Sequence, residues 1–195
     1  MLKNKLKDYH LILASGSPRR HQFFKDMELN FEVRIKSVDE IYPTDLKGAE
    51  ISDYLAKLKA EIFKLELKPK DILITSDTVV WYNNESLAKA IDSEEAESML
   101  KKMSGEWHQV ITSVCFTTNE RQIIQHSITE VKFKELSIEE IRHYIKEYQP
   151  FDKAGAYGIQ EWLGLIGIEQ IKGSYTNVVG LPTQLVYETL SKLVT

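Results

Sequence analysis

The chain is organised around the stretch Leu13-Ala14-Ser15-Gly16-Ser17-Pro18-Arg19-Arg20. An apolar run over residues 9–14 leads into it and predicts a buried strand. Ser17 followed by Pro18 is typical of a helix start, because serine caps free backbone amides and proline fits the first turn. The stretch therefore predicts a strand, a tight loop of small residues and a helix, in that order.

Two arginines, Arg19 and Arg20, lie in the first turn of this predicted helix. Positive charge there opposes the helix dipole and is mildly unfavourable unless an anion binds. Backbone amides, the hydroxyls of Ser15 and Ser17 and both guanidinium groups would then converge on a phosphate. From spacing alone, a capped helix with two solvated arginines is an equally good interpretation.

The composition indicates one globular unit. The chain has 195 residues and is 43% hydrophobic, enough for one sizeable core, so we expect a single domain over residues 1–195, with two lobes. The net charge of −4 argues against binding to nucleic acid or an anionic membrane surface. The single cysteine, Cys115, excludes an intrachain disulfide. No signal peptide or membrane span is recognisable, so we expect a cytoplasmic protein.

Hydrophobic periodicity predicts alternating helices and strands. The clearest signals are a helix from Ala49 to about Leu65 and a long antiparallel hairpin over 107–117 and 122–134. We expect the hairpin to form part of the second lobe. Residues 31–35 and 162–171 are also expected to be extended. The strand over Asp71 to Thr75 is expected to stop at Ser76-Asp77-Thr78, before an extended Val79-Val80-Trp81.

Charged side chains recur in the predicted loops and suggest chemistry on a phosphate. Asp77 is expected at the carboxyl end of a buried strand, a frequent catalytic position in α/β folds. With Glu40 it would bind Mg²⁺ or Mn²⁺. The basic side chains that would neutralise a polyphosphate are Arg19, Arg20, Lys59, Lys89 and Lys153. Together these side chains are suited to metal-assisted cleavage of a phosphoanhydride. Taken singly, each residue is better interpreted as part of the solvated surface.

Four motifs, in order, resemble the Maf family of nucleoside triphosphate pyrophosphatases. They are Leu13 to Arg20, Ser76-Asp77-Thr78-Val79-Val80, Asp152-Lys153-Ala154-Gly155-Ala156-Tyr157-Gly158-Ile159-Gln160 and Gly180-Leu181-Pro182. The resemblance covers about residues 10–192. It implies an α/β fold with a mixed twisted sheet, flanking helices and two lobes around a deep cleft, similar to the inosine triphosphate pyrophosphatases. It also implies a homodimer that cleaves nucleoside triphosphates to the monophosphate and pyrophosphate with a divalent metal.

The same resemblance assigns roles to single residues. It implies that Asp77 accepts the proton, that Arg20, Lys59 and Lys89 bind phosphate, and that Glu40 is the acidic loop residue.

Three further positions concern the base. The dTTP/UTP-specific subfamily carries Arg, Thr and Gln where this chain has Arg19, Thr78 and Gln160, whereas enzymes for 7-methyl-GTP differ there. A glutamine amide offers both a donor and an acceptor to a pyrimidine edge. The alternative is that Gln160 bonds to its own loop backbone.

One departure from the family pattern affects the expected activity. The family usually has Gly-Lys-Pro where this chain has Ala88-Lys89-Ala90. If the glycine held a positive φ, Ala88 would strain the loop or move it. This departure favours a second hypothesis, in which the chain is a nucleotide-binding regulator of septum formation with vestigial hydrolysis.

Overall fold

The computed structural model describes residues 1–194. Its centre is a mixed sheet in the order β2-β1-β3-β5-β6-β7, with β4 paired to β3. The strands are β1 (His10–Leu13), β2 (Glu32–Val33), β3 (Asp71–Tyr82), β4 (Glu85–Leu87), β5 (Trp107–Thr117), β6 (Gln122–Phe133) and β7 (Ile168–Lys172). The α-helices are α1 (Leu2–Lys5), α2 (Pro18–Asp26), α3 (Ala49–Glu61), α4 (Ser93–Met103), α5 (Ile138–Tyr148), α6 (Trp162–Gly167), α7 (Tyr175–Val179) and α8 (Thr183–Leu193). The expected mixed α/β fold is confirmed.

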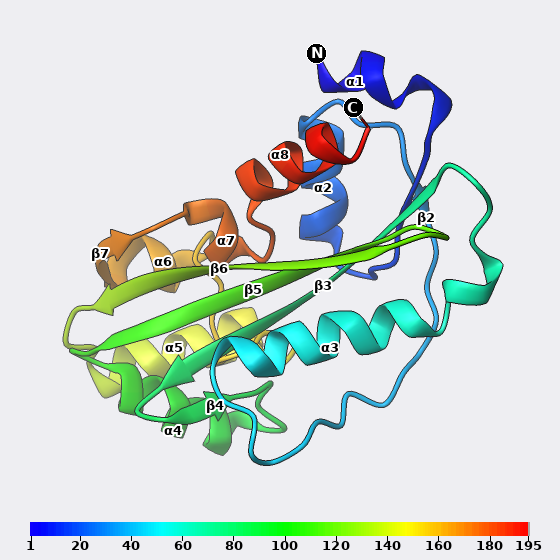
Figure 1. The fold of residues 1–195 in the computed structure, drawn as a ribbon. Helices are drawn as coiled ribbons and strands as arrows, with labels where there is room; N and C mark the ends of the chain where they lie inside the picture. The colour runs from blue at the N-terminus through cyan, green and yellow to red at the C-terminus, as the bar shows by residue number, and fades with distance from the viewer. Residues whose placement is uncertain (195) are drawn as a thin grey trace.

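The long strands β3, β5 and β6 cross the whole molecule (Figure 1). Helices α1, α2 and α8 gather at one end with both chain termini, and α4 and α5 lie at the other. Along β3, Ile72 and Ile74 pack into the core at the first end, whereas Val80 packs into the core at the second. The polar segment of β3 around Asp77 therefore lies between two hydrophobic cores.

One edge of β3 has a gap that positions the site. Strand β1 runs parallel to β3 and pairs with it as far as Leu13 opposite Ile74. Strand β4 pairs with β3 only from Val80 onward, and β5 fills the opposite edge from Leu73 to Trp81. No described strand therefore pairs with the first edge of β3 over residues 75–79. Side chains from both faces of the strand can reach an open space there.

The structure corrects the expected end of the strand before Asp77. Strand β3 continues through residues 76–78 because β5 supplies partners for them, with Asp77 opposite Ser113. Asp77 thus lies in the middle of a strand, and the prediction that it lies at a carboxyl end is wrong. The strand ends instead at Tyr82, and Asn83 and Asn84, with φ angles of 48° and 64°, make the turn into β4.

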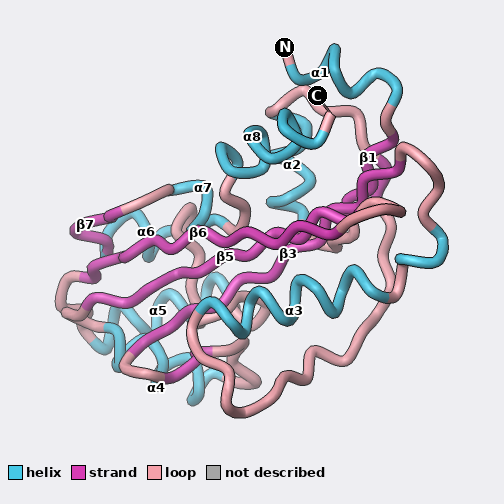
Figure 2. Tube along the Cα trace, viewed as in Figure 1, coloured by secondary structure: helices cyan, strands magenta, loops and turns pink. Residues whose placement is uncertain are grey.

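Other local predictions meet mixed outcomes. The strand expected over 162–171 is wrong for residues 162–167, which form helix α6, and is confirmed from Ile168, where β7 begins. The strand expected over 31–35 contracts to the two residues of β2. Helix α3 ends at Glu61, before the expected Leu65. Figure 2 shows the long loop that runs from β2 to α3 without regular structure. None of the helices within residues 1–194 has the length and apolar character needed to span a bilayer.

Candidate active site

The gap beside β3 opens into a cleft formed by two adjoining pockets, the first with an empty volume of about 800 Å³ including space open to solvent. Both pockets share Ser17, Arg19, Arg20, Lys59, Lys89 and Asp152. The first pocket adds Asp77, Thr78, Lys153 and Gln160, and the second adds Ser15 and Glu40. The structure thus brings every predicted site residue to one cleft, while the role of each stays a prediction.

Arg20 joins three segments that border the cleft. The side chain of Ser17 caps α2 by accepting a hydrogen bond from the backbone amide of Arg20. The Arg20 guanidinium donates through Nε to the Gly180 carbonyl and through Nη1 to the Ser76 carbonyl, both at 2.8 Å, and through Nη2 to Thr78 Oγ1 at 3.1 Å. Burial lowers the pKa of Arg20, and the nearby charge of Asp77 opposes that shift. Arg20 therefore acts as a clamp, in addition to any contact with phosphate.

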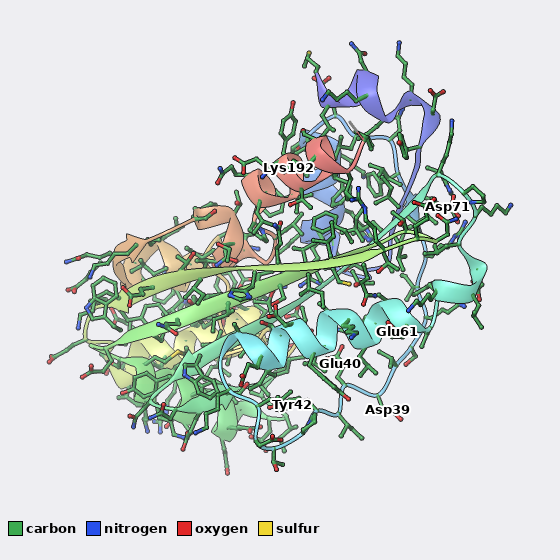
Figure 3. The ribbon with its side chains drawn as sticks, in the orientation of Figure 1. Asp39, Glu40, Tyr42, Glu61, Asp71 and Lys192 are labelled. Carbon is green, nitrogen blue, oxygen red and sulfur yellow. The ribbon has the colours of Figure 1, made fainter. Side chains whose placement is uncertain are left out.

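Lys59 lies between the two carboxylates predicted to bind a metal. Residues alternate along β3, so Asp77 faces α3, and Lys59 Nζ lies 2.6 Å from its Oδ1. The same nitrogen is 2.8 Å from Oε1 of Glu40. Figure 3 places Glu40 beside the middle of α3 and Asp39 farther from the helix. Partial burial is the largest single influence on Glu40 and would raise its pKa, but the hydrogen bond from Lys59 and the positive charges of Lys59, Lys89 and Arg20 together lower it.

Glu40 and Asp77 have the donor chemistry that a divalent cation prefers. Within residues 1–194, no group of three or more histidine, cysteine or acidic side chains is arranged to hold a metal. Mg²⁺ commonly takes one or two carboxylates and completes its shell with substrate phosphates and water. The two carboxylates are therefore chemically suitable as the protein ligands of such an ion, with phosphate oxygens and water as the others.

Lys89 is tied to the loop that follows α5. The amide of Gly155 donates to the carbonyls of Leu87 at 2.9 Å and Ala88 at 3.1 Å, and Lys89 forms a β-bridge with Ala154. Gly155 has a φ of 68°, and an added Cβ there would lie 3.0 Å from the Val80 methyl groups. Ala88 has no positive φ. The altered Ala88-Lys89-Ala90 segment therefore causes no left-handed strain, and Lys89 still faces the cleft.

The comparisons with known proteins identify the family. A family model described as "Maf-like protein" matches residues 10–193. The chain belongs to this family. A dTTP/UTP pyrophosphatase of Flavobacterium johnsoniae is 58% identical to this Maf-like chain over 194 residues and covers 100% of both. Proteins of the same name from Flavobacterium psychrophilum and Bacteroides thetaiotaomicron are 56% and 47% identical, covering 96% and 99% of the chain and 96% and 100% of the relatives.

Solved structures show a weaker likeness. The HAM1 protein of Coxiella burnetii aligns with a TM-score of 0.47 and 14% identity, over 94% of the Maf-like chain and 99% of that protein.

Lys153 is the predicted site residue whose surroundings are least expected. Its ammonium lies 2.7 Å from Oδ1 of Asp152 and 3.0 Å from Oε1 of Glu161. Arg19 Nη1 lies 3.6 Å from the other oxygen of Asp152. Burial is the largest single influence on Asp152 and would raise its pKa, but the hydrogen bond from Lys153 and the charges of Lys153 and Arg19 together lower it. Two carboxylates therefore already neutralise Lys153 in the Maf-like chain.

Sequence reasoning missed Glu161. Its position directly after Gln160 was the one available signal, and only the fold shows that its carboxylate turns back toward Lys153.

The first pocket, which Gln160 lines, is partly apolar. Its walls include Val80, Val110 and the buried Tyr157. The exposed side chain of Gln160 makes no hydrogen bond with any residue in the described part of the chain. The alternative in which Gln160 bonds to its own loop is therefore not observed. An apolar wall with one unengaged amide at its edge suits a flat heterocycle with polar edges.

Proposed function

We propose that this Maf-like chain hydrolyses dTTP and UTP to the nucleoside monophosphate and pyrophosphate. The observation that carries the proposal is that Asp77 shares one cleft with the arginine pair at the start of α2 and with Lys89. Cationic groups beside a carboxylate suit a triphosphate chain and an attacking water. The relatives named dTTP/UTP pyrophosphatase supply the substrate class.

The chain's own residues divide the work. Lys89, Lys59 and Arg20 bind the triphosphate, with the small loop over residues 15–17 allowing the backbone to approach it. Asp77 takes a proton from the attacking water as the linkage between the α and β phosphates breaks. Positive side chains stabilise the charge that passes to the departing pyrophosphate. A Mg²⁺ or Mn²⁺ ion held by Glu40, Asp77 and phosphate oxygens would polarise that linkage.

We propose that Gln160, Arg19 and Thr78 select the base. Thr78 Oγ1 accepts from Arg20 and lies 3.0 Å from Thr112 Oγ1, so its hydroxyl is held in place. The Gln160 amide, which has donor and acceptor groups, suits the edge of thymine or uracil.

The test is a pyrophosphate-release assay with dTTP, UTP, CTP and 7-methyl-GTP, each with Mg²⁺ or Mn²⁺. We expect release from dTTP and UTP, and a fall of about 10²–10⁴-fold in Asp77→Asn, the usual contribution of a general base. Binding of a non-hydrolysable analogue should survive the substitution. Unchanged release in Asp77→Asn would remove Asp77 from its assigned role, and release from 7-methyl-GTP alone would overturn the base assignment.

The regulatory hypothesis loses the feature that favoured it, because Ala88 carries no positive φ and Lys89 reaches the cleft.

We further propose a cytoplasmic homodimer that binds neither nucleic acid nor membrane, in keeping with a net charge of −4 and nucleotide substrates. Light scattering of the purified protein tests the dimer, and a salt titration with DNA tests the absence of nucleic-acid binding.

A further inference from the structure

A line of alternating charges runs from the cleft into the core. It begins at Arg19, passes through Asp152 and Lys153, and reaches Glu161. There it ends on the hydroxyl of Tyr144, which donates to Oε2 of Glu161. Lys153 is only 9% exposed, Glu161 is 21% exposed and Tyr144 is fully buried, so the inner half of this line is largely shielded from solvent. Charged and polar groups gain most from pairing in such surroundings.

The inner end of this line also holds the backbone near Gln160. The amide of Gly158 donates to the Tyr144 hydroxyl at 3.0 Å, and the amide of Glu161 donates to the Gly158 carbonyl at 3.0 Å. A Cβ on Gly158 would lie 2.9 Å from the Glu161 carboxyl carbon. An added Cβ at Gly158 would therefore displace the carboxylate from its position against this turn. Burial, followed by the Glu161 carboxylate, raises the pKa of Tyr144 and keeps its hydroxyl a donor.

We propose that Glu161, supported by Tyr144, is a positioning residue that holds Lys153 and the turn over residues 158–160, and so sets the affinity for the base. This inference rests on the proposed function. A phosphate ligand would need an available positive charge, whereas Lys153 is matched by two carboxylates. The network instead fixes the backbone that carries the Gln160 amide into the cleft.

Two substitutions test the network with little change in shape. Tyr144→Phe removes one hydroxyl, and Glu161→Gln removes one charge. Tyr148→Phe is the matched control, because Tyr148 lies on the same helix, stacks on Tyr144 at 5.1 Å and is 40% exposed. The readouts are kcat and KM for dTTP and UTP, and the inhibition constant of inorganic tripolyphosphate, which has no base.

We expect KM for dTTP and UTP to rise about tenfold in both variants, the effect of losing one buried hydrogen bond. The kcat value should stay within about threefold and the tripolyphosphate constant within about twofold, since the phosphate subsite is untouched. Tyr148→Phe should match the wild type. Tighter tripolyphosphate inhibition in Glu161→Gln would overturn the inference, because it would mean that a released Lys153 binds phosphate.

An equal loss of nucleotide and tripolyphosphate affinity would also overturn it, because it would indicate a general structural role. If the wild type releases no pyrophosphate, the proposed function fails. The dissociation constants of dTMP and tripolyphosphate, measured by calorimetry, then test the inference. We expect dTMP to bind about tenfold more weakly in both variants while tripolyphosphate affinity stays within about twofold. A wild type that does not bind dTMP would also overturn the inference about Glu161.

Discussion

Lys59 Nζ lies 2.6 Å from Oδ1 of Asp77 and 2.8 Å from Oε1 of Glu40, so one ammonium separates the two carboxylates proposed to bind a divalent cation. A divalent cation and an ammonium repel each other at such distances. The triphosphate offers Lys59 another anion. We therefore expect the metal to enter with the nucleotide and to bind the free protein weakly.

Replacing Lys59 by methionine should tighten Mn²⁺ binding to the nucleotide-free protein. The substitution removes the competing charge and leaves two carboxylates whose mutual repulsion favours a cation. We expect a gain of about tenfold in affinity, allowing for solvent screening at this partly exposed site. Titration followed by electron paramagnetic resonance of free Mn²⁺ measures it directly.

Lys57→Met on the exposed face of α3 is the control and should leave Mn²⁺ affinity unchanged. Equal or weaker binding in Lys59→Met would show that the ammonium does not occupy the cation position.

Arg20→Lys should cost both stability and turnover. A lysine cannot reproduce the planar fork that reaches Gly180, Ser76 and Thr78, so buried acceptors lose their donors. We expect a loss of about 2–4 kcal/mol in the free energy of unfolding, measured by urea denaturation. Arg19→Lys should cost less than about 1 kcal/mol, because its ion pair with Asp152 is long and partly exposed. Equal losses in the two variants would contradict the clamp.

Gly155→Ala should disturb Lys89 from a distance. The substitution places a Cβ against Val80 at a φ of 68°, for a cost of about 1–3 kcal/mol. Because the Gly155 amide holds the carbonyls of Leu87 and Ala88, we also expect weaker inhibition by tripolyphosphate. For stability, Gly16→Ala is the control, since its added Cβ would lie 3.8 Å from Ile35 and its φ is not positive. A variant as stable as Gly16→Ala would refute the strain argument.

Sequence reasoning succeeded where the signal is local. Ser17 before Pro18 marks a real helix start, as predicted. It failed at Asp77, because the partner that keeps β3 extended is Ser113, far along the chain. Helix α7 was missed because five residues show too little periodicity, although Ser174 caps it.

The candidate site shows the same contrast between local patterns, which the sequence reveals, and long-range contacts, which it does not. The small-residue loop and the charged residues were visible as patterns, and the fold brings them to one cleft. The pairing of Lys59 with Asp77 and of Lys153 with Glu161 depends on side-chain placement, which no local pattern encodes.

His108 should make the fold sensitive to acid. It is 2% exposed, and its Nε2 lies 2.7 Å from the hydroxyl of Tyr157, a residue of the cleft wall. Its Nδ1 is buried without a hydrogen-bond partner in the described part of the chain. Burial lowers the pKa of His108 to about 3 from an ordinary value of 6.5. Between these values the unfolded chain binds a proton that the folded chain does not, so stability is full above pH 6.5 and falls as pH drops.

His108→Gln removes this titration while keeping a group able to bond to Tyr157. The loss follows about 1.4 kcal/mol per pH unit below 6.5, so from pH 7 to pH 5 the wild type should lose about 2 kcal/mol more than the variant. Urea denaturation at both pH values measures the difference, whatever the variant costs at neutral pH. His143→Gln, at an exposed position, should keep the wild-type slope. Parallel slopes for wild type and His108→Gln would mean that His108 accepts its proton without unfolding the protein.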